Sequence, residues 1–282
     1  MGNLALRKKK DVSAFRKMAI GTWTTAYDPS VYGTMDLRME QALAYMQAFR
    51  AATGKHLTVT HMMARAAAAV FERMPDANAI LRWNRIYLRQ RIGVFFQVVL
   101  EDPKTGQIDL SGAVLYDPEQ KTVEEICDEL AARIERVRAS KDKKLESSRG
   151  MFRRMPYSLV NKMLRLISFF SYTLNLDLRW MGVPKDPFGS IMITNIGSLG
   201  LQEAYVPLVP YSRVPIVLAM GAVEDAPVVE NGAVVPGKLM RVCATFDHRV
   251  LDGAHAAVMA KTLRAWMEHP FEHFGPIPGS AR

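Results

Sequence analysis

The sequence predicts a single α+β domain, and three observations indicate this class. Residues 31–38 alternate between apolar and polar side chains, which is typical of a half-exposed strand. Residues 92–100 form a nearly continuous apolar run, which is typical of a buried strand. Residues 253–268 instead show the apolar spacing of a helix. Because no internal repeat or low-complexity linker divides the 282 residues, we expect strands and helices to share one core.

The remaining elements follow from the same periodicities and from local turn signals. A helix over 39–52 stops near Gly54, and a second helix from Thr58 or Thr60 to Met74 has an alanine-rich face suited to close packing. Glu124 and Glu125 favour the start of a helix that runs from 122 to 139, because acidic side chains stabilise helix N-termini. The other expected strands are two short ones within 79–88 that turn at Asn84, then 108–116, 190–195, 216–223 and 239–246.

Asn231-Gly232 predicts a tight hairpin between the last two strands. The closing helix over 253–268 is expected to pack back on the sheet. Residues 1–12 contain Arg7-Lys8-Lys9-Lys10 and are interpreted as a flexible basic arm, which leaves 13–282 as the domain.

The net charge of +9 narrows the classes of partner. Such a balance is compatible with nucleic acid, an anionic membrane surface or a phosphate-rich ligand such as coenzyme A. Nucleic acid is the weakest of the three, because no basic stretch is interleaved with aromatic residues. We therefore expect no nucleic-acid partner.

The two cysteines and the hydropathy indicate the compartment. Cys127 and Cys243 are too few and too isolated for a disulfide framework or a zinc site, so we expect a reducing compartment and no metal. The basic N-terminus is not followed by an apolar stretch of signal-peptide length, and no uncharged apolar run is long enough to span a membrane. A cytoplasmic location is the expectation.

The motif with the clearest chemistry is the run from Thr245 to His255, which reads TFDHRVLDGAH. His248 is a candidate general base, because an unperturbed imidazole titrates near neutral pH. Asp252 could fix the turn that carries His248 or pair with a distant cation, and Gly253 would let the backbone bend sharply. The alternative is a buried histidine satisfied by hydrogen bonds.

Residues 247–253, with the sequence DHRVLDG, resemble the DHRxxDG signature of the catalytic domain of 2-oxoacid dehydrogenase acyltransferases. These enzymes share a fold with chloramphenicol acetyltransferase, and His255 is also similar to the last histidine of the HxxxDGxH run of the chloramphenicol enzymes. The resemblance implies a two-layer sandwich with a mixed sheet and flanking helices. It also implies an acyltransferase that uses coenzyme A, with His248 as the catalytic base.

A second segment, residues 190–200, resembles the TFTISNxGxxG block of the same family, in which a serine hydroxyl donates to the oxyanion. Thr194 occupies the serine position. A threonine hydroxyl can make the same hydrogen bond, but the β-branch fixes χ1 and the extra methyl narrows the pocket. The alternative is an ordinary strand threonine. Asn195 and Gly197 are expected to shape the turn after this strand.

The resemblance carries two further implications. Arg16 falls where the chloramphenicol enzymes place an arginine that pairs with the aspartate of the motif, which is Asp252 here. The family fold also implies a homotrimer, in which one chain presents the histidine and its neighbour presents the oxyanion hydroxyl. Together these expectations make His248, Thr194 and Asp252 the catalytic set, with Arg16, Asn195, Gly197 and Gly253 in support.

Two departures from the family affect the interpretation. The sequence contains no lipoyl-lysine segment, so the thioester would come from acyl-CoA or from a separate lipoyl protein. Residues 147–185 form an insertion where the family usually has a short connection. Within it, one helical face is apolar (Leu159, Met163, Leu166, Ile167, Phe170 and Leu174) and the other is polar (Ser158, Asn161, Lys162, Arg165 and Ser168).

Two interpretations of this insertion remain open. Its apolar stripe could cover the sheet or a subunit contact. It could instead line an acyl channel, or rest on an anionic membrane through 156–175.

Three hypotheses for function follow. The first is a stand-alone acyltransferase that moves an acyl group between coenzyme A and an unidentified acceptor. The second is a dihydrolipoamide acyltransferase core that works with a separately encoded lipoyl carrier. The third is a non-catalytic trimeric scaffold that has kept the motif.

Overall fold

A six-stranded mixed sheet forms the centre of the computed structural model, which describes residues 2–10, 29–101, 108–138 and 156–279. The strand order is β2-β9-β8-β7-β5-β6. β7 runs parallel to both β5 and β8, and the other neighbouring strands are antiparallel. The strands are β2 (Ser30–Arg38), β5 (Gly93–Glu101), β6 (Ile108–Tyr116), β7 (Ile191–Asn195), β8 (Ile216–Glu230) and β9 (Ala233–Asp247).

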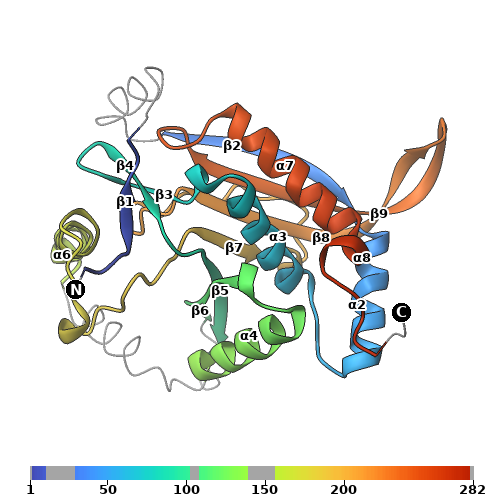
Figure 1. The fold of residues 1–282 in the computed structure, drawn as a ribbon, viewed down its shortest axis with the longest axis horizontal. Helices are drawn as coiled ribbons and strands as arrows, with labels where there is room; N and C mark the ends of the chain where they lie inside the picture. Colours follow the sequence, from blue (N-terminus) through green and yellow to red (C-terminus); the bar gives the residue numbers. More distant parts are fainter. Residues whose placement is uncertain (1, 11–28, 102–107, 139–155, 280–282) are drawn as a thin grey trace.

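One face of this sheet is covered by helices (Figure 1). Ala66, Ala67, Ala68 and Ala69 are all buried, so the alanine-rich stretch packs closely as predicted. The main core lies between the helices and the sheet. The expected two-layer α+β architecture with a mixed sheet is therefore confirmed. The helices are α2 (Glu40–Thr53), α3 (Val59–Arg73), α4 (Val123–Arg138), α7 (Gly253–Glu268) and the short α8 (Pro270–His273).

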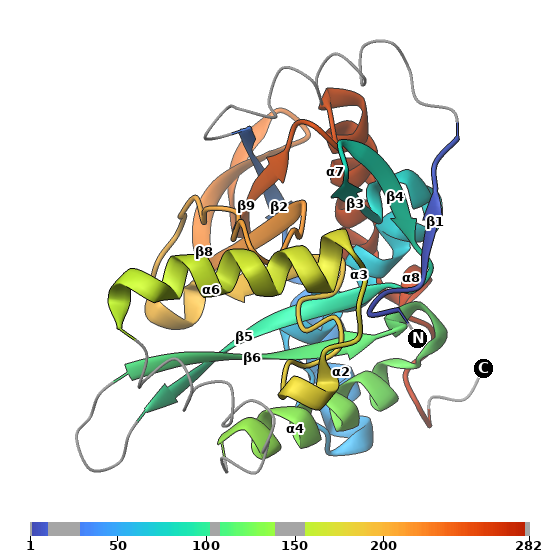
Figure 2. The same cartoon turned by 90° about the vertical axis from the view of Figure 1, so that its left-hand side faces the viewer.

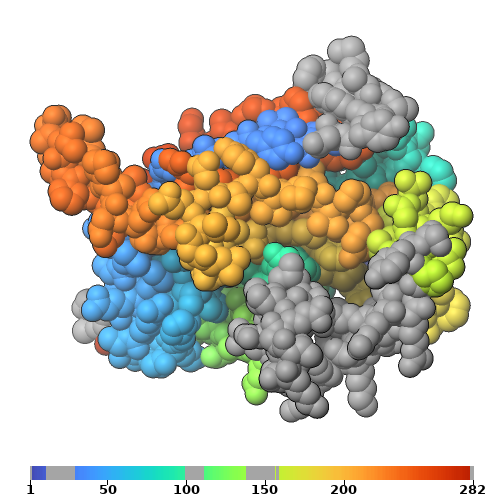
Figure 3. All heavy atoms as spheres, turned by 180° about the vertical axis from the view of Figure 1, so that it is seen from behind, coloured from blue at the N-terminus to red at the C-terminus, as the bar shows by residue number. Residues whose placement is uncertain are grey.

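β8 and β9 are longer than the sequence patterns predicted, and their outer halves form a hairpin that projects from the body (Figures 1 and 3). The tight turn at Asn231-Gly232 is confirmed, with φ values of 50° and 83°. Pro227 pairs with Pro236 across the hairpin. Proline lacks the N–H that a central strand must donate, so the two prolines made this segment resemble a loop in the sequence. A two-stranded ribbon tolerates proline, because each strand has one edge without a partner strand.

The N-terminal residues form a strand, which corrects the expectation of a flexible arm for residues 2–10. β1 (Leu6–Lys8) pairs with β4 (Arg85–Arg89), and β4 pairs with β3 (Ala79–Arg82) to give a second, three-stranded sheet. Leu4 is buried beside Ile80 and Tyr172, and Leu6 packs against them. In a strand only alternate side chains face the core, and in this segment the residues after Leu6 are basic. The basic run therefore gave no sign of a strand.

The described part of the insertion contains α6 (Tyr157–Ser168), followed by a π-helical turn (Phe169–Thr173) and a 3₁₀ turn (Arg179–Met181). It is held by the N-terminal segment. Asn3 Nδ2 donates to the Ser171 carbonyl at 3.1 Å, and Asn175 Nδ2 donates to the Leu4 carbonyl at 2.8 Å. Residues 147–155 of the insertion lie outside the described ranges.

Only part of the predicted apolar stripe of α6 faces the body, and Lys162 and Arg165 of the predicted polar side remain exposed. The expectation that the stripe covers the sheet is therefore wrong for its exposed members. Leu159 and Leu166 are 47% and 50% exposed, whereas Ser168 is only 6% exposed. Periodicity fixes which residues share a helical face but not which face points inward. Among the described residues, no helix has both the length and the apolarity needed to cross a membrane.

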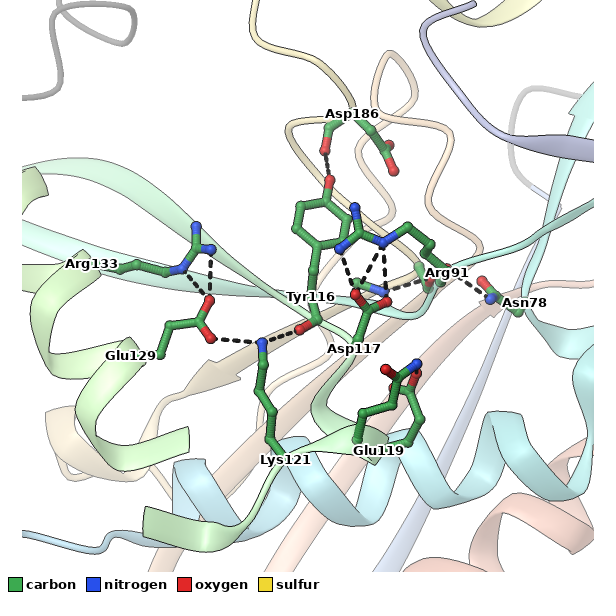
Figure 4. A network of polar contacts seen from close by, with 12 residues as sticks. Asn78, Arg91, Tyr116, Asp117, Glu119, Lys121, Glu129, Arg133 and Asp186 are labelled. Carbon is green, nitrogen blue, oxygen red and sulfur yellow. Dashed lines mark hydrogen bonds and ion pairs between the residues drawn. The ribbon is translucent and has the colours of Figure 1, made fainter. Parts of the chain in front are cut away.

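A polar network joins the connection between β6 and α4 to the loop before β7 (Figure 4). The Tyr116 hydroxyl donates to the Asp186 carbonyl at 2.5 Å, and Arg91 forms an ion pair with Asp117. Lys121 contacts both the Tyr116 carbonyl and Glu129. The contact between Tyr116 and Asp186 anchors the loop that leads into β7, the strand that carries Thr194.

Candidate active site

His248 lies in the tight turn that follows β9. The turn is held by backbone hydrogen bonds from His248 N–H to the Pro29 carbonyl at 3.0 Å and from Leu251 N–H to the Asp247 carbonyl at 2.9 Å. The ring Nδ1 lies 2.7 Å from the Leu251 carbonyl oxygen. Because a carbonyl can only accept, this contact places the proton of a neutral ring on Nδ1. Nε2 then keeps its lone pair, which a general base requires.

The two charged neighbours of His248 neutralise each other. The buried carboxylate of Asp247 accepts from the backbone N–H of Arg249 at 2.9 Å and from its Nε and Nη2 at 3.0 and 2.7 Å. Charge-assisted hydrogen bonds of this kind have a defined geometry. The pair therefore fixes the turn on either side of the imidazole.

Asp252 is the N-cap of α7. Its Oδ1 accepts from Ala254 N–H at 3.0 Å and from His255 N–H at 3.2 Å, and it also lies 2.7 Å from His255 Nδ1. These contacts satisfy N–H groups that have no partner inside the helix. The expectation that Asp252 fixes the turn is consistent with this capping.

Gly253 is the first residue of α7, and the sharp bend expected there is not present. Its φ is not positive, and an added Cβ would meet nothing within 4 Å. The chain changes direction at Asp252, whose extended backbone is open to any residue. Gly197 differs, because a Cβ there would lie 2.5 Å from the Gly221 carbonyl oxygen, so this turn requires glycine.

Thr194 lies on β7, half-buried, with Oγ1 3.2 Å from Oε1 of Gln97 on the neighbouring strand β5. Sequence reasoning missed Gln97, although it is the one polar side chain in the apolar run 94–100 and could have been noticed for that reason. Asn195 shapes the following turn as expected, since its Oδ1 accepts from Ser198 N–H at 3.1 Å. Its Nδ2 also donates to Thr60 Oγ1 at 3.4 Å.

Within one chain, Thr194 and His248 are far apart. Thr194 is in register with Ala219 on β8, which is in register with Cys243 on β9. His248 lies five residues beyond Cys243, so the two side chains are separated by two strand spacings and five residues of rise, on the order of 20 Å. A single chain does not bring the candidate base and the candidate oxyanion donor together.

A cavity of about 810 Å³ opens beside the Thr194 end of the site. Its wall includes Gln97 and Asn195, the residues that contact or follow Thr194, but neither Thr194 nor His248 itself. Such a volume accommodates a drug-sized ligand. The other lining residues are Lys55, His56, Thr58, Thr60, His61, Phe96, Val98, Cys127, Asp128, Leu130, Ala131, Ile134, Glu135 and Ile193.

Two titratable groups in this wall are held neutral at physiological pH. Burial, reinforced by nearby His56 and Arg50, lowers the pKa of His61 to about 4. The His61 Nδ1 accepts from the Thr58 N–H at 3.1 Å, which completes a capping box at the start of α3. Burial likewise raises the pKa of the Cys127 thiol to about 11, so it is a poor nucleophile.

Arg16, expected to pair with Asp252, lies outside the described residues. Among the residues that are described, no group of three or more His, Cys, Asp or Glu side chains is arranged to hold a metal ion.

Comparison with known proteins supports the class that the fold and the motif define. Residues 188–274 match the family model for the catalytic domain of 2-oxoacid dehydrogenase acyltransferases. This segment contains Thr194, His248 and Asp252. The chain is also similar to the dihydrolipoyllysine-residue acetyltransferase component of the acetoin cleaving system of Bacillus subtilis, with 23% identity over 217 residues, covering 77% of this chain and 43% of that protein.

Solved structures show the same fold. Azotobacter vinelandii dihydrolipoamide acetyltransferase, studied for the catalytic role of a serine, a histidine and an asparagine, aligns with a TM-score of 0.64 and 20% identity over 95% of both chains. The cubic core of a pyruvate dehydrogenase multienzyme complex aligns with a TM-score of 0.65 and 19% identity, also over 95% of both chains. Chloramphenicol acetyltransferase aligns with a TM-score of 0.50 and 12% identity, covering 93% of this chain and all of that one.

The resemblance to the catalytic domain of 2-oxoacid dehydrogenase acyltransferases is therefore confirmed, together with its chloramphenicol acetyltransferase-like fold. The chain spans less than half the length of the Bacillus relative.

Proposed function

We propose that the protein is an acyltransferase that moves an acyl group between coenzyme A and an acceptor, with His248 as the general base. The observation that carries this proposal is the contact between His248 Nδ1 and the Leu251 carbonyl, within a segment that matches an acyltransferase family model. The contact leaves Nε2 able to take a proton. We assign the reaction to the cytoplasm.

In this reaction, Nε2 of His248 removes the proton from the thiol, hydroxyl or amine of the acceptor. The acceptor atom then forms a bond to the thioester carbonyl carbon, and the carbonyl oxygen gains negative charge. The C–S bond breaks as the intermediate collapses, and the imidazolium returns its proton to the sulfur of coenzyme A. The acyl group moves from the sulfur to the acceptor, and the proton moves from the acceptor to the sulfur. No other reactant is therefore needed.

The negative oxygen requires a donor, and we assign this role to Thr194 of a neighbouring subunit in a homotrimer. The separation of Thr194 from His248 on the order of 20 Å within one chain supports a site shared between chains. Gln97 would position the hydroxyl. If its amide nitrogen faces Thr194 Oγ1, the nitrogen donates to Oγ1 and leaves the hydroxyl proton for the oxyanion.

The first experiment measures thiol release from a panel of acyl-CoA donors of increasing chain length, with the wild type and His248→Ala. We expect release with the wild type and a loss of at least 10²-fold in the variant, the lower range for removal of a general base. His269→Ala is the matched control, because His269 is the C-cap of α7 and should leave the rate unchanged. Equal rates for wild type and His248→Ala would favour the scaffold and refute the proposal.

The second experiment tests the shared site by mixing two inactive variants. His248→Ala and Thr194→Ala chains are combined under conditions that allow subunits to exchange. If each site takes its imidazole and its hydroxyl from different chains, random reassembly restores both groups in about a quarter of the sites. No recovery, despite exchange confirmed by mass spectrometry of tagged chains, would show that both groups act from one chain.

A second candidate is a dihydrolipoamide acyltransferase that works with a separate lipoyl protein. The name of the Bacillus relative favours it, because that protein is a dihydrolipoyllysine-residue acetyltransferase. The same thiol assay decides between the two. Transfer to a dihydrolipoyl domain added in trans, at a rate well above that to free dihydrolipoamide, would support the second candidate.

A further inference from the structure

Exposed apolar side chains follow one side of α6 and of the turn after it, and point away from the body. This surface, called the outer face of α6, consists of Leu159, Leu166, Phe169, Phe170 and Leu174. Hydrogen bonds on the opposite side set this orientation. Arg213 donates from Nε to Ser168 Oγ at 3.1 Å and from Nη2 to Thr173 Oγ1 at 2.7 Å. Ser168 and Thr173 are both buried. Rotating the helix to hide its apolar face would break these contacts and leave Arg213 without them.

An aromatic cluster extends this face onto the hairpin between β3 and β4. Trp83, at the tip of the hairpin, is 60% exposed. Its ring centroid lies 6.0 Å from that of Phe169, which in turn lies 5.6 Å from that of Phe170. Figure 2 shows α6 lying lengthwise across this side of the molecule. The apolar surface is therefore a continuous patch rather than a scatter of single side chains.

The charged side chains within residues 156–176 and at the tip of the β3–β4 hairpin are positive. The stretch 156–176 contains no aspartate or glutamate. Lys162 and Arg165 on α6 and Arg85 at the hairpin are exposed, and none of them forms an ion pair with another described residue. Apolar and aromatic side chains beside unpaired cations are typical of helices that lie in a membrane interface.

We propose that the outer face of α6 binds the surface of a bilayer that contains anionic lipids. Leu166, Phe170 and Trp83 would enter the boundary between headgroups and acyl chains, and Lys162 and Arg165 would contact the anionic headgroups. A two-fold contact with a second copy of this chain fits less well, because the same patch would meet itself and each cation would face cations. A head-to-tail contact, as in a trimer, is an outcome of the test below.

The test is flotation of the full chain with vesicles of phosphatidylcholine, alone or mixed with phosphatidylglycerol. We expect binding only to the mixed vesicles, and release by high salt. Lys162→Gln and Arg165→Gln should each lower the partition coefficient roughly fivefold, since a cation near an anionic surface contributes about 1 kcal/mol. Leu166→Ser combined with Phe170→Ser should abolish binding. As matched control, Val229→Ser with Val234→Ser removes exposed apolar groups at the other hairpin and should change nothing.

Two results would overturn the proposal. One is an absence of flotation with mixed vesicles. The other is equal flotation of the wild type and the Leu166→Ser, Phe170→Ser variant. If that variant instead changes the oligomeric mass measured by light scattering while the wild type does not float, the face is a contact between copies of this chain. Thiol release by the variant, measured in parallel, keeps this outcome independent of the proposed acyl transfer.

Discussion

Arg89 Nη1 and Asp186 Oδ2 lie 2.6 Å apart, with side chains that are only 3% and 14% exposed. The pair joins β4 to the loop that leads into β7. Asp186 Oδ1 and the Nε and Nη2 of Arg89 are buried without a hydrogen-bond partner among the described residues. The pair thus neutralises two buried charges but leaves part of their hydrogen-bonding capacity unused.

Removal of one partner should therefore destabilise the protein strongly. Asp186→Ala leaves the Arg89 guanidinium buried and uncompensated, which should lower the free energy of unfolding by about 3–5 kcal/mol. Urea denaturation measures this value. The exposed pair of Lys238 and Asp225 is the control, and Asp225→Ala should cost less than about 1 kcal/mol. An Asp186→Ala loss as small as the control would contradict a buried, coupled pair.

Thr194 should contribute to the rate through its hydroxyl rather than through its methyl group. We expect Thr194→Ala to lower kcat by about 10²–10³-fold, the usual loss for one oxyanion donor, and Thr194→Ser to keep most of the activity. The assay is thiol release at saturating acyl-CoA. Equal losses in the two variants would assign Thr194 a packing role on β7.

Asp252 should stabilise the protein as the cap of α7. Asp252→Asn keeps an oxygen that can accept from Ala254 and His255, so stability should change by only a few tenths of a kcal/mol, whereas Asp252→Ala should cost about 1 kcal/mol. Thermal unfolding and thiol release of both variants test this, and a strong rate loss in Asp252→Asn would show that the charge itself is needed.

His61 should make stability depend on pH. Its pKa falls from 6.5 to about 4 on folding, so the unfolded chain binds a proton that the folded chain does not. Keeping His61 neutral costs no stability above pH 6.5, where the unfolded chain is also unprotonated. As the pH falls from 6.5 toward 4, only the unfolded chain gains the proton, so the free energy of unfolding decreases. Between about pH 7.5 and about pH 5, the loss should be about 2 kcal/mol.

His61→Gln is the matched variant for this prediction. Its side-chain oxygen can still accept from the Thr58 N–H, as glutamine does in a capping box, but it does not titrate. Urea denaturation at both pH values should therefore show a smaller difference for the variant. An unchanged difference would assign the pH dependence to other groups.

Much of the fold could be predicted from the sequence, because most elements carry a local signal. The helix over 253–268 has Asp252 as a cap and apolar residues at helical spacing, and its observed bounds are those predicted. Both turn residues of the β8–β9 hairpin adopt the positive φ that Asn-Gly indicates. These features depend on residues that are neighbours in the sequence, so the sequence alone is sufficient to predict them.

The rest depends on contacts between distant segments. Helical spacing identified an apolar stripe on α6, but its outward orientation follows from Arg213, which comes after β7. Likewise, β1 requires β4 as a partner, and Gln97 becomes part of the site only because β5 lies beside β7. No local pattern in the chain contains these pairings.

The distance from Thr194 to His248 has a consequence for the kinetics of any reaction that uses both groups. A fully folded but isolated chain would be inactive, because its His248 and its Thr194 cannot contact the same substrate molecule. Turnover per chain should then rise steeply with protein concentration and level off once association is complete. Dilution would inactivate the protein reversibly by separating the subunits, while each chain stays folded.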